Sequence, residues 1–337
     1  MPENLSQNRK PLALVTGVTG FIGSHLAEAL LKEGFRVKAL VRPTSDLRWI
    51  KGLEMELLSG SLHDSKFLEQ AAAGADYIFH LAGAVKVKNP RDFYLHNAQA
   101  TLNLAKAAVA TASGLKRFLF VSSQAAAGPA ECLQRPVCER DQCRPLSNYG
   151  QSKLQAEREL LGLSGNLPVT IVRPPSVYGP RDTEVLAYFR WINRGLALLP
   201  GLRTRYANLI YVTDLVGGII APAKEQKSIG KTYFLAGDRA YSWQEISDAI
   251  AQSLGTKPLK IHLPLGLAYF SALMSEAGAA VTLKPGLFTR QKVNEMAQRY
   301  WLVSSQAAKE DFGFKCRYDL PQGMAETALW YKQQGWI

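Results

Sequence analysis

A chain of 337 residues is long enough for one large domain, or for a cofactor-binding domain that carries a smaller second domain. Hydrophobic residues make up 47% and charged residues 20%, a balance that excludes a disordered chain and predicts a sizeable core. The net charge of +12 is scattered, without an aromatic-interleaved basic block, so we expect anionic small molecules rather than nucleic acid as partners.

Short apolar runs alternate with helical patterns through the first half of the chain. Residues 1–11 are polar and lack the apolar run of a signal peptide, so we expect a frayed leader before the first strand. We predict buried strands at residues 12–15, 36–41, 55–58, 77–81, 118–121 and 169–172, and helices at 21–31, 65–73, 91–112 and 149–161. This alternation is typical of an α/β fold of the Rossmann type, a doubly wound parallel sheet with right-handed crossovers.

The pattern loosens after about Gly179. We predict helices at residues 184–194, 214–223, 243–254 and 321–334, and strands at 209–212 and 232–235. Residues 11–180 are therefore expected to form an NAD(P)-binding Rossmann domain. Residues 181–337 are expected to form mainly a smaller C-terminal substrate-binding domain, with some segments returning to the Rossmann sheet.

Residues 263–283 are notably apolar but are interrupted by Pro264, Ser271, Glu276 and Gly278. A membrane span needs about 20 predominantly apolar residues, and a carboxylate near its centre would be costly. We favour a packed helix of the substrate domain. A lid, a pocket wall or a membrane-surface contact is the alternative, and a true span ranks last.

A glycine-rich turn, Thr16-Gly17-Val18-Thr19-Gly20-Phe21-Ile22-Gly23, joins the first strand to the first helix. A strand before and a helix after are the context that a dinucleotide fingerprint needs. Gly17 permits the tight turn, Gly20 lets the backbone approach a pyrophosphate at the positive helix end, and Gly23 allows close helix–sheet packing. We predict cofactor contacts from Thr16, Gly17, Thr19, Gly20, Phe21, Ile22 and Gly23.

The second strand ends at Arg42, where an NAD site usually offers an acidic residue to the adenosine ribose. Lys38 and Arg48 add positive charge nearby. A guanidinium matches the 2′-phosphate of NADP through charge-assisted, bidentate hydrogen bonds. We therefore favour NADP over NAD, with the alternative that Arg42 stacks on the adenine without selecting a phosphate.

Ser122 and Ser123 end a strand, and Tyr149 opens a helix that carries Lys153 four residues later. Residues i and i+4 share a helical face, so Lys153 is expected beneath Tyr149. The ammonium and the charge of an oxidised nicotinamide would stabilise a phenolate, which predicts a pKa of Tyr149 below about 10. Tyr149 would then act as acid/base at a substrate oxygen that Ser123 also hydrogen-bonds. The same spacing arises by chance on amphipathic helices, but the order of motifs favours catalysis.

The four cysteines do not match the paired spacing of zinc sites, so no metal is predicted. Free thiols in a reducing cytoplasm are expected. Cys132, Cys138 and Cys143 cluster between two of the motifs, so one of these thiols could line the substrate pocket.

Taken in order, these motifs resemble the extended short-chain dehydrogenases/reductases, and the resemblance runs from about Pro11 to the C-terminus. It implies that Asn97 supports the active-site lysine and a proton-relay water. It also implies a homodimer in which helices 91–112 and 149–161 of two subunits pair into a four-helix bundle. Further cofactor contacts implied by the resemblance are Leu81, Ala82 and Gly83 beside the cofactor, and Pro174, Ser176 and Val177 on the nicotinamide side.

Three departures from the family pattern narrow the function. Ser61, in Gly60-Ser61-Leu62, stands where the family often has an Asp for the adenine, so Ser61 and Leu62, or His63 or Asp64, are left to make that contact. Gln124-Ala125 follows Ser123 where sugar-nucleotide 4,6-dehydratases carry Asp-Glu, which argues against dehydration. Ser176 stands where nucleotide-sugar epimerases commonly have Asn. Arg42, the Arg173-Pro174-Pro175 form and the apolar segment look more like the hydroxysteroid dehydrogenase and dihydroflavonol reductase branch.

The leading hypothesis is an NAD(P)-dependent oxidoreductase that moves a hydride between the nicotinamide and a hydroxyl or ketone carbon of a medium-sized, partly apolar small molecule. The alternative is a nucleotide-sugar epimerase that retains NAD. A non-catalytic dinucleotide-binding scaffold ranks third, because such a protein need not keep Ser123, Tyr149 and Lys153 together.

Overall fold

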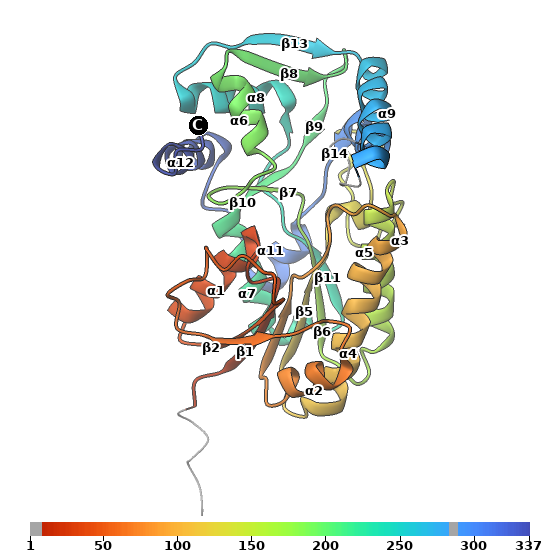
Figure 1. The fold of residues 1–337 in the computed structure, drawn as a ribbon, viewed down its shortest axis with the longest axis vertical. Helices are drawn as coiled ribbons and strands as arrows, with labels where there is room; N and C mark the ends of the chain where they lie inside the picture. The colour runs from red at the N-terminus through yellow and green to blue at the C-terminus, as the bar shows by residue number, and fades with distance from the viewer. Residues whose placement is uncertain (1–8, 283–288) are drawn as a thin grey trace, which may run out of the picture.

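The computed structural model describes residues 9–282 and 289–337 and is built on a seven-stranded parallel sheet (Figure 1). The strand order is β11–β6–β5–β4–β1–β2–β3. Their bounds are Leu12–Thr16 (β1), Arg36–Val41 (β2), Glu56–Ser59 (β3), Tyr77–His80 (β4), Arg117–Val121 (β5), Val169–Arg173 (β6) and Lys231–Phe234 (β11). All seven strands lie close to predicted positions, and the Rossmann-type sheet is confirmed.

Apolar runs make these strands because the sheet is covered on both faces. Every residue of β1, β5 and β6 is buried. One core joins the sheet to α1 (Phe21–Lys32), α7 (Val212–Lys224) and α11 (Gln306–Phe312). The opposite core joins it to α2 (Ser65–Ala72), α4 (Ala100–Thr111) and α5 (Asn148–Gly162). Figure 1 shows these helices on the two sides of the sheet.

The helix predicted over residues 91–112 is not continuous. It begins as α3 (Arg91–Phe93), widens into a π-helical turn at Tyr94–Gln99, and continues as α4. The spacing of apolar residues in the sequence does not reveal such a change of hydrogen-bond register. π-Helical turns occur frequently at functional sites, and this one carries Asn97.

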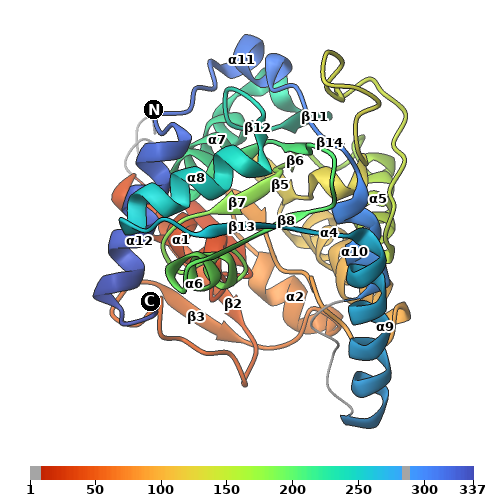
Figure 2. The same cartoon turned by 90° about the horizontal axis from the view of Figure 1, so that it is seen from above.

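The remaining elements lie beyond the carboxyl ends of the parallel strands (Figures 1 and 2). Small sheets are formed by β7 (Ser176–Tyr178) with β10 (Leu209–Tyr211), by β12 (Tyr241–Ser242), β9 (Tyr206–Ala207) and β14 (Tyr300–Trp301), and by β13 (Leu259–Leu263) with β8 (Leu196–Pro200). A core around Phe189 and Tyr331 holds α6 (Leu186–Asn193), α8 (Trp243–Leu254) and α12 (Leu320–Gln333) together. Because β11, α7 and α11 pack on the central sheet, later segments do return to it, whereas the domain boundary at residue 180 stays a prediction.

The apolar segment after β13 forms α9 (Leu265–Thr282), and α10 (Arg290–Ala297) packs on it; position 283 of the predicted segment lies outside the described residues. The expected burial of this helix is only partly correct. Ala268 and Ala272 are buried, but the large side chains of Leu267 and Phe270 are exposed. Among the described helices, none is long and apolar enough to cross a membrane.

Candidate active site

The strand order places a crevice at the carboxyl ends of β1 and β4. From β1 the chain winds one way to β2 and β3 and then back to β4, β5 and β6. In doubly wound sheets, ligands bind at this topological switch point. The glycine turn follows β1, and Leu81–Gly83 follows β4, so two predicted cofactor segments meet at the crevice.

The glycine turn approaches the backbone after β4 so closely that side chains are excluded. Gly17 has a φ of +73°, and a Cβ on it would lie 2.7 Å from the backbone nitrogen of Ala82. A Cβ on Gly23 would lie 2.1 Å from the carbonyl oxygen of Gly17. Gly20 is the exposed N-cap of α1 and supplies no side chain to the first-turn N–H groups. This helix end can therefore accept an anionic phosphate, and Thr19, Phe21 and Ile22 are partly exposed around it.

The Thr16 side chain does not face the crevice freely, because it is fully buried and hydrogen-bonded within the protein. Its Oγ1 lies 2.6 Å from His80 Nδ1 and accepts the Ala82 N–H at 3.2 Å. Nε2 of the same histidine lies 2.8 Å from Thr101 Oγ1, and that hydroxyl donates to the Asn97 carbonyl oxygen at 2.5 Å. Burial lowers the pKa of His80 to about 3, so the ring is neutral. A hydrogen-bonded chain thus joins the glycine turn to the π-helical turn.

Arg42 lies at the carboxyl end of β2 and is exposed. Within the described residues, no acidic side chain pairs with its guanidinium, whereas Arg48 is paired with Asp46. Arg42 is therefore an unpaired cation at the predicted ribose position.

The predicted adenine segment is more constrained than its sequence suggests. Ser61 Oγ accepts the His63 N–H at 3.1 Å, and the Leu62 carbonyl oxygen accepts from Asn103 Nδ2 at 3.1 Å. Asp64 does not serve as a free adenine contact, because its carboxylate caps α2 by accepting the Phe67 N–H. His63 is exposed and remains available.

Ser123, Tyr149 and Lys153 come together beside this crevice. Ser123 follows β5, and Ser147 caps α5 by accepting the Gly150 N–H at 3.2 Å, which fixes the start of the helix that carries Tyr149. The Ser123 side chain lies near enough to Tyr149 to lower the pKa of its phenol. Lys153 is buried and donates from Nζ to the Val121 carbonyl oxygen at 2.8 Å. Tyr149, which can hold a proton, thus lies next to Ser123, which can orient a substrate oxygen.

Burial shifts the pKa values of both Tyr149 and Lys153. Burial raises the pKa of Tyr149 to about 12, although the Ser123 side chain opposes this rise, and the nearby Glu295 carboxylate adds to it. Burial lowers the pKa of Lys153 to about 7, against the opposing charge of Glu157. The predicted lowering of the Tyr149 pKa by Lys153 is not seen, because burial dominates this pKa; lowering by the charge of a bound nicotinamide stays a prediction.

Asn97 lies in the π-helical turn and links two functional segments. Its Oδ1 accepts the Ala84 N–H at 2.7 Å, and its Nδ2 donates to the Ala84 carbonyl at 3.1 Å and to Ser152 Oγ at 2.9 Å. A Cβ on Gly83 would lie 2.9 Å from Asn97 Oδ1 and 3.8 Å from Lys153 Nζ. Asn97 therefore positions the strand-end segment against α5; its part in a proton relay stays a prediction.

Of the other predicted contacts, Ser176 and Val177 lie in β7, the former exposed and the latter partly exposed. Pro174 is buried, and its carbonyl oxygen accepts the Gln124 N–H at 2.8 Å, which ties this loop to the segment after Ser123.

A buried ion pair beneath Lys153 escaped the sequence analysis. Glu157 pairs with Arg173 at 2.5 Å and also accepts from the Ser122 hydroxyl. The second guanidinium contact is Cys143 Sγ, 3.3 Å from Arg173 Nη2. Glu157 lies four residues after Lys153, so extension of the i, i+4 spacing by one step would have found it. All four cysteines are free.

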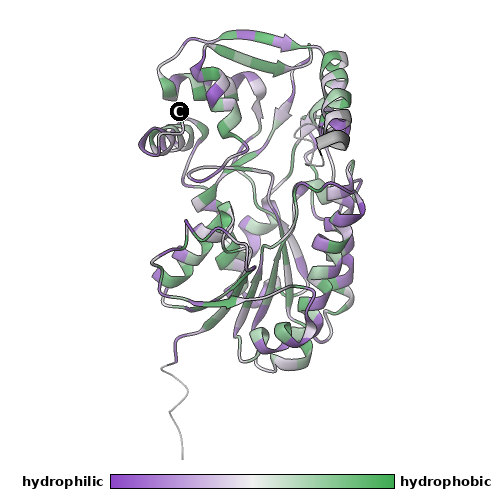
Figure 3. Ribbon diagram, in the orientation of Figure 1, coloured by the Kyte–Doolittle hydropathy of each residue, from purple (hydrophilic) through white to green (hydrophobic). Residues whose placement is uncertain are grey.

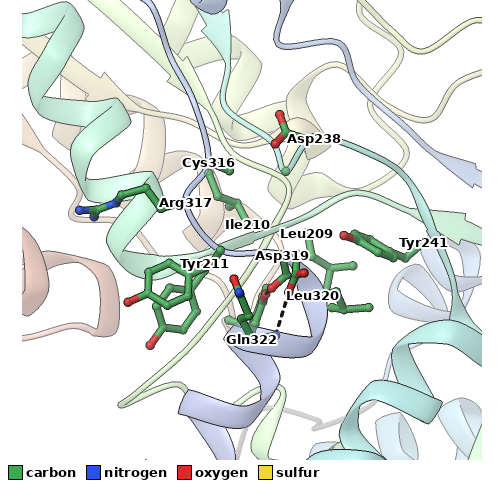
Figure 4. Close-up of a pocket in the computed structure, with 13 residues that line it drawn as sticks. Leu209, Ile210, Tyr211, Asp238, Tyr241, Cys316, Arg317, Asp319, Leu320 and Gln322 are labelled. Atoms are coloured by element: carbon green, nitrogen blue, oxygen red, sulfur yellow. Dashed lines mark hydrogen bonds between the residues drawn. The ribbon is translucent and has the colours of Figure 1, made fainter.

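Two cavities in the described part of the chain lie away from this site. One of about 290 Å³ lies between β10 and the segment 316–322, with Tyr211, Arg317 and Asp319 in its wall (Figure 4). Another, of about 450 Å³, lies between α1 and α7. Ser123, Tyr149 and Lys153 line neither, so strand order and hydrogen bonds, rather than cavity size, define the candidate active site.

Comparison with known proteins agrees with this geometry. The model of the NAD dependent epimerase/dehydratase family matches residues 13–236. A ceramide reductase of Caulobacter vibrioides is 30% identical over 99% of this chain and 98% of that protein. A UDP-glucose 4-epimerase of Vibrio cholerae is 27% identical over 95% of each chain. The crystal structure of gox2253 has a TM-score of 0.80 and 29% identity, covering 97% of this chain and 100% of that chain. Reductases and epimerases are thus both among its relatives, and the chain belongs to the NAD-dependent epimerase/dehydratase family of extended short-chain dehydrogenases/reductases.

Proposed function

We propose that the chain is an NADP-dependent reductase of a ketone on a medium-sized, partly apolar substrate, with the reverse oxidation of the alcohol at the same site. The observation that carries this proposal is the placement of Ser123 next to the buried Tyr149, with the buried Lys153 on the same helix, at the open end of the sheet. Gln124 and Ala125 follow Ser123, so no second acid or base stands there for eliminating water.

In this reaction, residues of the chain donate the proton to the substrate oxygen and orient that oxygen. A bound nicotinamide would supply the hydride in the reduction. Because the pKa of Tyr149 is about 12, its phenol is protonated at neutral pH and is ready to donate to a carbonyl oxygen. Ser123 orients that oxygen. Lys153, with a pKa of about 7, lies near enough to neutrality to lose and regain a proton. The protonated phenol is the form of Tyr149 that reduction of a ketone requires.

The cofactor would lie across the switch point. The uncapped N-terminus of α1 fits the pyrophosphate. The unpaired Arg42 fits a 2′-phosphate, which supports NADP over NAD. The substrate class follows from the relative named ceramide reductase, since a ceramide is a lipid, and the proposed substrate is correspondingly apolar.

The first test is a fluorescence titration of the protein with NADPH and with NADH, repeated with Arg42→Ala. Loss of a charge-assisted contact to phosphate should weaken NADPH binding by about 10- to 100-fold and leave NADH binding nearly unchanged. Arg36→Ala is the matched control, because Arg36 is exposed at the other end of β2. Equal affinity for both cofactors in the unaltered protein would reject the phosphate site.

The likeness to the Vibrio cholerae epimerase favours a second candidate, a nucleotide-sugar epimerase that retains NAD. Such an enzyme consumes no added cofactor. NAD that copurifies without exchange, together with conversion of a sugar nucleotide and no net oxidation of NADPH, would replace the reductase proposal with this one.

A further inference from the structure

Helix α9 exposes its large apolar side chains and buries its small ones. Ala268 and Ala272 contact Val293 of α10 in a small core. Leu267, Phe270 and Met274 follow at helical spacing on the other side and are 56%, 62% and 57% exposed. A helix that packs on a protein core shows the reverse arrangement, with the large apolar residues inside.

The exposed surface extends beyond the helix. Leu202 is 77% exposed, and its neighbour Gly201 donates its N–H to the Leu263 carbonyl just before α9. We define the α9 face by Leu202, Ile261, Leu267, Phe270, Leu273 and Met274, which are all exposed. In Figures 1 and 2, α9 stands at the edge of the molecule, and Figure 3 shows apolar residues along it. Several large apolar side chains exposed on segments that adjoin one another mark an interaction surface.

The segments around the α9 face are strongly basic. Residues 196–205, 257–282 and 289–299, which form β8, β13, α9, α10 and their flanks, contain seven Lys or Arg residues and two Glu residues. Both acids are engaged. Glu276 accepts from the backbone N–H and the Nε of Arg290 at 2.8 and 2.7 Å, and Glu295 accepts from Ser147 Oγ at 2.7 Å. Arg205 is buried and Lys260 pairs with Asp248 of α8, so the exposed excess of positive charge rests on Arg203, Lys257 and Arg299. This excess complements an anionic surface rather than a second copy of this basic chain.

We propose that the α9 face docks on an anionic lipid membrane, with its apolar side chains among the acyl chains and the basic residues at the headgroups. A helix that lies in the interface binds through buried apolar area together with attraction to anionic lipids. Spanning is not required, and no described helix is suited to it. This docking goes beyond the proposed reaction and does not depend on its catalytic residues.

The same hairpin reaches the candidate active site. From α10, Gln291 Oε1 accepts the Asn148 N–H at 3.0 Å, and Glu295 accepts from the cap residue of α5. Tyr149 is the next residue along that helix. An enzyme docked through α9 would thus hold the mouth of its site beside the membrane, where an apolar ketone is dissolved; this last step rests on the proposed function.

The test is flotation of the full chain with vesicles of phosphatidylcholine alone and of phosphatidylcholine with phosphatidylglycerol. We expect binding to the anionic vesicles that weakens with salt. The triple variant Leu267→Gln, Phe270→Gln, Met274→Gln should bind on the order of a hundredfold more weakly. The matched control is Leu57→Gln with Leu329→Gln, two apolar residues exposed elsewhere, which should bind as the unaltered chain does.

Failure to float with anionic vesicles, or equal flotation of the triple variant, would overturn the proposal. A triple variant that changes from dimer to monomer in light scattering would do so too, because a second copy would then cover the face. Turnover of a water-soluble ketone by the triple variant should match the unaltered chain. Loss of flotation with retained turnover therefore separates the docking from the proposed reaction.

Discussion

At the scale of single residues, the candidate site depends on a tyrosine that burial holds in its protonated form. Tyr149→Phe removes the proton donor but keeps the ring, which contacts Phe93 at 6.0 Å between centroids. We expect turnover to fall by about 100- to 10,000-fold or more, while the Kd for NADPH stays within about twofold because the phenol is not a phosphate contact. Steady-state kinetics and the fluorescence titration measure the two effects. A fully active variant would remove Tyr149 from the mechanism.

Glu157 is the positioning residue beneath this pair. Its charge raises the pKa of Lys153, which burial lowers to about 7. Glu157→Gln should lower the pKa of Lys153 further, and activity that needs the ammonium would then be lost at a pH lower by about one unit or more. The measurement is the pH dependence of kcat, which a merely structural role would leave unshifted.

This prediction needs one control variant and one precaution about stability. Glu159→Gln changes the same charge on the same helix but lies off the Lys153 face, so its pH profile should be unchanged. Because Glu157→Gln leaves Arg173 buried without its partner, about 3–5 kcal/mol of stability is at risk. The profile is therefore recorded below the melting temperature of the variant. An unshifted alkaline limb would show that Lys153 titrates independently of Glu157.

The spacing of residues predicted which side chains meet at the site but not their pKa values. The Tyr-x-x-x-Lys spacing, placed after a serine at a strand end, predicted that Ser123, Tyr149 and Lys153 share one site. The direction of the Tyr149 shift follows instead from burial, to which the Glu295 carboxylate of α10 adds. Burial and the approach of α10 belong to tertiary packing, and a local motif carries no information on either.

At the scale of elements, His80 joins β1, β4 and α4 through Thr16 and Thr101. The folded protein keeps this ring neutral to about pH 3, whereas the unfolded chain binds a proton near pH 6.5. Between these values the unfolded state holds more protons, so acid favours unfolding. Between pH 6.5 and 5 the free energy of unfolding should fall by about 2 kcal/mol from this group.

Urea denaturation at several pH values measures this fall, and His80→Gln should abolish most of it while lowering stability at pH 7. His96→Gln is the control, since His96 is exposed and its side chain lies outside the chain of hydrogen bonds. Equal pH slopes for the unaltered protein and His80→Gln would mean that acid acts through other groups.

The central strands were predictable because a two-sided parallel sheet requires continuous apolar runs, as in β1 and β5. Two features of the helices, the π-helical turn and the buried face of α9, were not predictable. The π-helical turn at Tyr94–Gln99 preserves the helical pattern of residues 91–112 while it changes the hydrogen-bond register. Helix α9 is apolar in sequence on every side, so the sequence alone could not tell which face the protein covers; the small core with Val293 decides it.

At the scale of the whole molecule, strand order explains why distant motifs form one site. The winding reverses between β1 and β4, which opens the crevice, and the elements beyond the strand ends stand over it (Figure 1). The sequence predicted a doubly wound parallel sheet but not the order of its strands. Strands β8 and β13 of the C-terminal part escaped prediction, since β13 is exposed over most of its length and pairs with a segment distant in the sequence.

The outer face of α4 and α5 carries the last prediction, a homodimer. Val109 near the end of α4 and Leu161 near the end of α5 are exposed apolar residues on adjacent helices, and Leu95 is exposed just before α4. A four-helix interface between two copies would bury them. Light scattering should give about twice the chain mass of 37.1 kDa. Val109→Glu with Leu161→Glu should give the monomer, because two carboxylates would be buried against their copies. The Leu57→Gln, Leu329→Gln variant should stay dimeric, and a monomeric unaltered chain would refute the interface.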